Sequence, residues 1–261
     1  MNMGSKKRGQ VTLFVIIAIV IVAAFLAGFL LYQNSHEKNQ IKANAEIAPV
    51  KEYIEICLKY TAVNGIKFIG MQGGYYHEPE NYFAFEEYAI PYYSYEGKKQ
   101  MPSKEIIGQE LSSYIRDNID YCLDNFSLFN KSFNISAGKN VFVNSKIIKE
   151  SVIINLNLPV IITKRGEKFY LENFTLSLDY DLFGVYDTLQ DIVEIGLKNP
   201  LYTNDALLLD LLKQSGNFSI IQNPITNQVV LFVFLDNSTK AINLFNNPYT
   251  FQFVSKYLPI K

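Results

Sequence analysis

One uninterrupted apolar run constrains this chain more than any other feature. Val11–Tyr32 (VTLFVIIAIVIVAAFLAGFLLY) holds 22 residues with no charge and no proline. As a helix it would be roughly 33 Å long, enough for a hydrocarbon core about 30 Å thick. Backbone groups cannot be hydrated there, so a spanning segment must be helical. The run therefore predicts a transmembrane helix over residues 11–32, with the lipid bilayer as a partner of the chain.

The charges that flank this run predict its orientation. Residues 1–10 contain Lys6, Lys7 and Arg8 and no acidic residue, which favours a cytoplasmic N-terminus. A cleaved secretory signal also begins with basic residues, but its apolar region is shorter. The nearest small-residue cleavage motif, at residues 43–45, lies more than ten residues beyond the run. We therefore expect a single-pass protein of the cell membrane with an extracellular C-terminal domain.

The residues at the start of the apolar run resemble a known class of signal sequence. Lys6-Lys7-Arg8-Gly9-Gln10, followed by VTLF, resembles the class III signal peptide of archaeal type IV pilin-like proteins. The resemblance implies cleavage between Gly9 and Gln10, and packing of residues 11–32 with copies of itself or with pilin-like subunits. Phe14 stands where many pilins carry a glutamate, which argues against a major filament subunit. A plain signal anchor with a chance Gly-Gln pair is the alternative.

Composition limits what the remaining 229 residues can do. They carry 21 basic and 25 acidic residues, so they lack the basic surface of a nucleic-acid-binding domain. Residues 33–48 are polar and predict a stalk. Residues 49–261 are enough for one domain, and a division into subdomains 49–136 and 137–261 is left open. This part, with its GMQGGYY and PYYSYEGKKQMPS stretches, also resembles uncharacterised archaeal single-span surface proteins, a resemblance that supplies no activity.

Periodicity predicts an α+β fold class: a long N-terminal transmembrane helix, then an extracellular domain of helices packed on antiparallel sheet. Apolar spacing indicates helices from Pro49 to Gly70 and from Ser103 to Leu123. The glycine-rich GMQGG stretch closes the first helix, so we interpret it as a turn rather than a phosphate loop. Pro159 places its strand at an edge or marks a bulge. Further helices and strands are expected at 182–199, from 204, and at 152–162, 174–180, 218–221, 229–235 and 249–254.

The two cysteines, Cys57 and Cys122, both fall on the apolar faces of these predicted helices. Outside the cytoplasm such a pair predicts a disulfide, whereas in a cytosolic protein two reduced core residues would be expected. Six N-x-S/T sequons follow the apolar run, where chance predicts about two. They indicate glycosylation of an outward-facing domain at Asn125, Asn130, Asn134, Asn173, Asn217 and Asn237.

The most unusual stretch is Tyr75–Tyr95 (YYHEPENYFAFEEYAIPYYSY), in which the alternation over residues 82–90 predicts a strand with rings on both faces. Tyrosines offer contact area at low entropic cost, so Tyr82, Tyr88 and Tyr92 are candidates for a surface that binds a glycan or a partner protein. The alternative is that the stretch forms hairpin strands that pack on the first helix, with the hydroxyls at the rim.

Catalytic motifs are missing from the sequence. It holds two histidines, His36 and His77, and no HExxH or GxSxG pattern. His77 beside Glu78 and Glu80 is expected to be solvated, and a cleft that gathers His77 with carboxylates would revive an extracellular hydrolase. We predict no enzyme, no cofactor and no metal site. The sequence indicates a membrane-anchored surface protein, structural, adhesive or filament-associated, or alternatively a monomeric receptor that binds through residues 75–95.

Overall fold

A computed structural model describes Val22, Leu26 and residues 45–85, 87–201, 205–215 and 217–259. The chain divides into two compact units, residues 1–50 and 51–261. In the first unit the described residues 45–50 are helical, which includes the last four residues of the predicted stalk. The rest of the stalk, the basic segment 1–10 and the apolar run lie outside the described residues, apart from Val22 and Leu26.

The predicted fold class needs a correction at the N-terminus. In the part of the chain that the structure describes, no helix is long and apolar enough to cross a membrane. The first described helix, residues 45–71, is amphipathic: Ile54, Leu58 and Ile66 are buried, while Lys51 and Lys59 are exposed. One apolar stripe and one charged face are typical of a helix that packs on one side of a protein core. The fold class shown is α+β.

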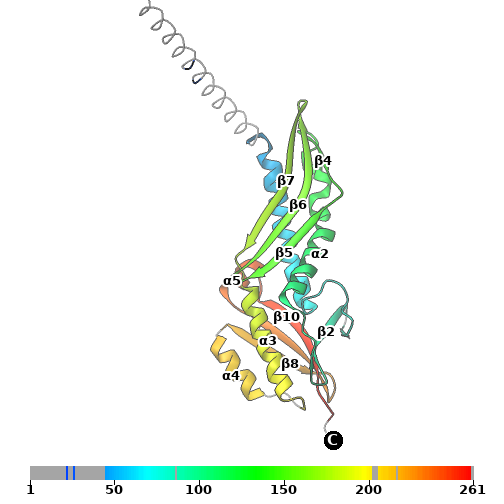
Figure 1. Ribbon diagram of the computed structural model, residues 1–261, viewed down its shortest axis with the longest axis vertical. Helices are drawn as coiled ribbons and strands as arrows, with labels where there is room; N and C mark the ends of the chain where they lie inside the picture. The colour runs from blue at the N-terminus through cyan, green and yellow to red at the C-terminus, as the bar shows by residue number, and fades with distance from the viewer. Residues whose placement is uncertain are drawn as a thin grey trace, which may run out of the picture. The chain divides into compact units, whose positions relative to one another are not determined.

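The second unit contains two sheets and several helices (Figure 1). The elements in chain order are β1 (Tyr82–Phe85), β2 (Tyr88–Tyr95), β3 (Lys98–Lys99), α2 (Lys104–Leu123), the 3-10 helix η1 (Asp124–Phe129), β4 (Asn134–Ala137), β5 (Phe142–Ile148), β6 (Ser151–Lys164), β7 (Glu167–Leu178), α3 (Leu182–Lys198), α4 (Asp205–Ser215), β8 (Phe218–Pro224), β9 (Val229–Asp236), α5 (Thr239–Phe245) and β10 (Tyr249–Lys256).

The first sheet has the order β1-β2-β10-β9-β8, with β3 paired to β2. Its pairings are antiparallel except for β10 with β2, which run parallel and bring Val254 opposite Tyr92. The predicted purely antiparallel sheet was therefore wrong at this pair. The inner face is aromatic: Tyr93 and Phe232 both stack on Phe253, with ring centroids 4.9 Å apart in each pair.

The second sheet is built around β6, which pairs with β4, β5 and β7. The predicted edge position for this strand was wrong, but the predicted bulge is present between Asn157 and Val160. Pro159 lies between the residues that pair with β5 and those that pair with β4, so its missing N–H costs no ladder bond. The β6–β7 hairpin turns at Arg165 and Gly166, both with positive φ, as a two-residue hairpin turn requires.

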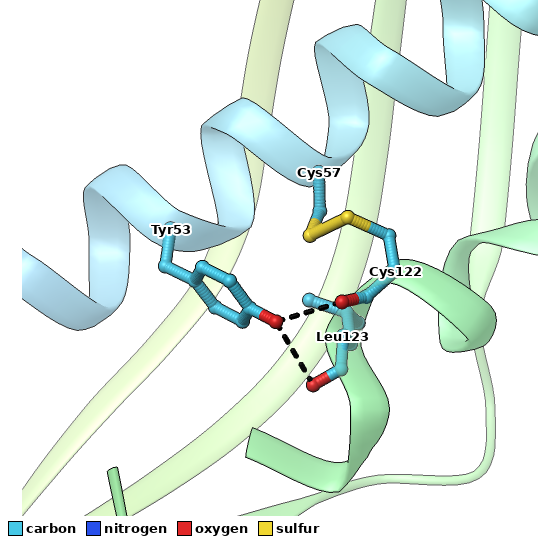
Figure 2. The surroundings of a disulfide bond; sticks show 4 residues. All are labelled: Tyr53, Cys57, Cys122 and Leu123. Carbon is cyan, nitrogen blue, oxygen red and sulfur yellow. Dashed lines mark hydrogen bonds between the residues drawn. A yellow bond between two sulfur atoms is a disulfide. The ribbon is translucent and has the colours of Figure 1, made fainter. Parts of the chain in front are cut away.

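A disulfide between Cys57 and Cys122 joins the first helix to α2, with the two Cα atoms 5.5 Å apart (Figure 2). Beside it, the Tyr53 hydroxyl donates to the backbone oxygens of Cys122, at 2.7 Å, and Leu123, at 3.4 Å. These oxygens belong to the last turn of α2, whose carbonyls have no partner within the helix. The disulfide and Tyr53 therefore fix the C-terminal end of α2 against the first helix.

Candidate functional site

The tyrosine-rich stretch is a loop over residues 75–81 followed by the β1–β2 hairpin, so the strand predicted over residues 82–90 is divided into the two hairpin strands of the alternative interpretation. The loop begins at the glycine turn that closes the first helix. Gly73 and Gly74 have φ values of +55° and +90°, and a Cβ on Gly73 would lie 2.5 Å from Pro91 Cγ. Only glycine fits a position with both constraints. The helix itself continues to Met71, one residue beyond the predicted stop at Gly70.

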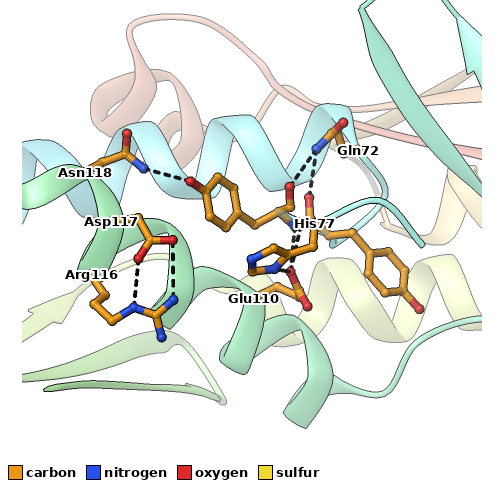
Figure 3. Close-up of polar contacts among 8 residues, drawn as sticks. Gln72, His77, Glu110, Arg116, Asp117 and Asn118 are labelled. Carbon is orange, nitrogen blue, oxygen red and sulfur yellow. Dashed lines mark hydrogen bonds and ion pairs between the residues drawn. The ribbon is translucent and has the colours of Figure 1, made fainter. Parts of the chain in front are cut away.

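Two side chains hold this loop, one from α2 and one from the turn that follows the first helix. Glu110 of α2 accepts through Oε2 from the backbone N–H groups of Tyr76, at 2.9 Å, and His77, at 3.0 Å. Gln72, which is buried, donates through Nε2 to the backbone oxygens of Tyr75 and Tyr76 and accepts from the N–H of Ala89. Figure 3 shows both side chains reaching the same stretch of loop backbone. The loop is thus bonded from both sides and has a defined conformation.

His77 completes this arrangement. Its Nδ1 lies 2.9 Å from the same Glu110 Oε2. An ionised carboxylate only accepts hydrogen bonds, so the His77 Nδ1–H donates to Glu110. The His77 side chain is 57% exposed and that of Glu110 only 19%. The predicted solvated histidine is therefore oriented by a half-buried carboxylate.

These residues form one wall of a pocket of about 480 Å³, which we call the 75–110 pocket. This volume lies within the range of small-ligand sites. Its chemically active lining consists of Tyr75, His77, Glu78, Glu80, Tyr92 and Glu110. Two prolines and an amide pair complete the wall, and in that pair the Asn81 amide donates to Gln100 Oε1 at 2.9 Å.

The carboxylates that line the 75–110 pocket make it acidic. Three carboxylates and one imidazole line it, and no lysine or arginine is among its described lining residues. Burial raises the pKa of the Tyr75 hydroxyl, and the negative charges of Glu110 and Glu80 raise it further. Both carboxylates therefore act on the same hydroxyl. The arrangement offers hydrogen-bond acceptors and aromatic surface to a neutral or positively charged ligand.

The three predicted binding tyrosines have different environments. Tyr92 lines the 75–110 pocket, and burial raises its pKa. Tyr88 and Tyr92 both pack against the cluster of Ile90, Val229, Leu231 and Val254. Tyr82 is 39% exposed and does not line the pocket. Tyr75 and Asn81 lie within the predicted binding region 75–95 but were not named as candidates, whereas Gln100 and Glu110 were missed. Glu110 gave no signal, because it lies on the polar face of α2.

The other predicted sites are distributed over the surface or lie outside the described residues. All six sequon asparagines have exposed side chains. Asn173 Oδ1 accepts from Asn157 at 2.9 Å, which leaves its Nδ2 for a glycan. The leader residues Lys6, Lys7, Arg8, Gly9 and Gln10 lie outside the described residues. Within the described part of the chain, no group of three or more His, Cys, Asp or Glu residues could hold a metal ion.

No protein-family model matches this chain, and no similar protein was found among curated sequences or solved structures. The features of this chain that bear on its function are therefore the geometry and chemistry of the 75–110 pocket, the disulfide and the exposed sequons.

Proposed function

We propose that this is a cell-surface protein with an adhesive role, whose second unit binds a glycan in the 75–110 pocket outside the cytoplasm. The observation that carries the proposal is the pocket itself. It combines tyrosine rings with carboxylate, amide and imidazole groups in about 480 Å³. Sugar rings present C–H faces that pack on aromatic side chains and hydroxyls that pair with carboxylates and amides. The pocket offers both kinds of contact.

Two features support a location outside the cytoplasm. The Cys57–Cys122 disulfide joins two packed helices, and such bonds persist in oxidising compartments. The six sequon asparagines are exposed, as acceptors for a glycan must be. A structural or filament-associated role depends on residues 6–32, of which the structure describes only Val22 and Leu26, so it stays a prediction from the pilin-like resemblance.

We expect protein purified from its native cells to carry glycans at the exposed sequons. Asn173 is the most informative site, since its Nδ2 points away from the bond that Asn157 makes to its Oδ1. Peptide mapping by mass spectrometry, with and without enzymatic deglycosylation, measures occupancy at each asparagine. Unmodified asparagine at all six positions would contradict the outward location.

The glycan-binding role predicts that Tyr92→Ser weakens binding about tenfold, which corresponds to about 1.4 kcal/mol. The substitution removes a ring from the pocket wall. The measurement is an array of neutral, amino and acidic glycans probed with the full chain, followed by titration of the best ligand. Tyr121→Ser is the matched control, because Tyr121 is 83% exposed on α2 and does not line the pocket.

Because Tyr92 also packs against a buried cluster, a second variant separates binding from folding. Asn81→Ala removes the exposed amide that donates to Gln100 and leaves that cluster intact. We expect it to weaken binding while circular dichroism and the urea midpoint stay close to wild type. Absence of any glycan ligand, or equal affinity for wild type, Tyr92→Ser and Asn81→Ala, would contradict the proposed function.

A further inference from the structure

The charge of the 75–110 pocket is not balanced by the cations of the elements around it. Lys99, next to Gln100, pairs with Glu194 at 3.6 Å. Lys104, on the same helix as Glu110, pairs with Asp187 at 2.9 Å. Lys256, which bonds Tyr95 at the end of β2, pairs with Glu96 at 2.6 Å. Each of these lysines is thus engaged with a carboxylate that does not line the pocket.

The carboxylates of the pocket fall into two kinds. Glu110 Oε2 receives three N–H groups, from the backbone of Tyr76 and from the backbone and ring of His77. Its role is therefore to position the loop. Glu78 and Glu80 are exposed, and among the described residues neither has an ion-pair partner. They are the two carboxylates that remain available to a ligand.

Aromatic and apolar surface accompanies these two carboxylates. Tyr75 and Tyr92 line the pocket with Pro79 and Pro91. The faces of tyrosine rings attract cations, and a partly desolvated ammonium group gains more from them than an exposed one. A carboxylate beside a ring face is a suitable environment for an ammonium group carried on an apolar frame. An acidic sugar would instead meet three carboxylates of like charge.

We infer that the 75–110 pocket selects a positively charged amino sugar, with Glu80 and Glu78 pairing with its ammonium group. This inference rests on the proposed glycan-binding function and names its ligand class. The pocket is expected to bind the free amine more tightly than its N-acetylated form, which has the same ring and hydroxyls but no charge. It also excludes uronic and sulfated sugars as preferred ligands.

The test compares two ligands that share their ring and hydroxyls and differ in the amino substituent, which is a charged ammonium in one and a neutral acetamide in the other. Glucosamine oligomers and N-acetylglucosamine oligomers of equal length are titrated into the full chain by calorimetry at low and at high salt. We expect the glucosamine oligomer to bind at least tenfold more tightly at low salt, with most of this preference lost at high salt. Glu78→Gln/Glu80→Gln should remove the preference, so that the double variant binds the two oligomers with similar affinity. Glu55→Gln, a carboxylate outside the pocket lining, is the matched control.

The outcomes separate this inference from the function on which it rests. Equal binding of both oligomers, or tighter binding of the N-acetylated one, would overturn the inference and leave glycan binding in place. A charge preference that persists in the double variant would also overturn it, since the ammonium would then be recognised elsewhere. If no glycan of the array binds, the proposed function and the inference both fail.

Discussion

Replacing both cysteines, as Cys57→Ala/Cys122→Ala, is expected to lower the free energy of unfolding by about 4 kcal/mol. The disulfide closes a sequence separation of 65 residues. In the chain-entropy model, a loop of this size restricts the unfolded chain enough to stabilise the folded state by about 4 kcal/mol. The bond also joins two helices whose buried faces form part of the core, so the loss is expected across the second unit rather than at one end of a helix.

Urea unfolding followed by circular dichroism measures the free energy of unfolding of wild type and of the double variant. Wild type in reducing buffer gives a second comparison, because its disulfide is then also absent. Tyr53→Phe is the matched control at the same helix junction. It removes the hydroxyl that donates to the carbonyls of Cys122 and Leu123 and leaves the ring and the disulfide in place. Its expected cost is about 1 kcal/mol. A loss below about 1 kcal/mol in the double alanine variant would show that the disulfide is dispensable for this fold.

The disulfide was predicted from the presence of two cysteines and the expected compartment, and local periodicity placed Cys57 and Cys122 on the apolar stripes of two predicted helices. The second of these helices was predicted to begin at Ser103, which is the N-cap of α2 in the structure. The hairpin at residues 164–167 was predictable from its turn residues. The information for the helix faces and for this turn lies within a few residues along the chain.

Features that depend on distant pairing could not be predicted. Pro159 left an edge position and a bulge as alternatives, and the sequence could not decide between them because it does not show that β5 and β4 share one side of β6. The parallel pairing of β10 with β2 joins residues about 160 positions apart. The short helix α5, capped by Ser238, was missed within a strand-rich region.

The candidate site likewise depends on residues that are distant along the chain, which the sequence does not bring together. The tyrosine-rich stretch was conspicuous from its composition, and one of its three nominated residues, Tyr92, lines the pocket. Glu110, however, reaches the loop from α2, 33 residues beyond His77. A single glutamate on the polar face of a helix is ordinary, so nothing marked it. The apolar run 11–32 predicted a transmembrane helix, whereas the described residues contain no helix able to cross a membrane.

Three buried tyrosines predict that the fold loses stability steeply in alkali. Tyr93, Tyr180 and Tyr249 are each at most 1% exposed. Burial is the main cause that raises the pKa of all three hydroxyls, and the charge of Asp236 adds to the effect at Tyr180 and Tyr249. Tyr180 donates to that carboxylate at 2.9 Å, and Tyr93 donates to the backbone oxygen of Gly73. These bonds require the protonated hydroxyl.

The sign follows from linkage between folding and proton binding. In the unfolded chain tyrosine loses its proton near pH 10, whereas these three hydroxyls stay protonated in the folded state well above that pH. Their contribution is therefore complete below pH 10 and is lost as the pH rises beyond it. Each group lowers the free energy of unfolding by about 1.4 kcal/mol per pH unit, so the three together lower it by about 4 kcal/mol per pH unit.

The sharpest test uses Tyr249→Phe, because the Tyr249 hydroxyl is buried without a hydrogen-bond partner among the described residues. Removing it should leave stability at pH 7 unchanged or higher, and should reduce the alkaline slope by about one third relative to wild type. Tyr180→Phe removes a titrating group too, but it leaves buried Asp236 without that donor, so it should also lose stability at pH 7. Urea unfolding between pH 8 and 11.5 gives the slopes, and tyrosinate absorbance counts how many of the 18 tyrosines ionise before unfolding. Ionisation of all 18 near pH 10 in the folded protein, or the same slope in wild type and Tyr249→Phe, would show that these hydroxyls are not shielded from solvent.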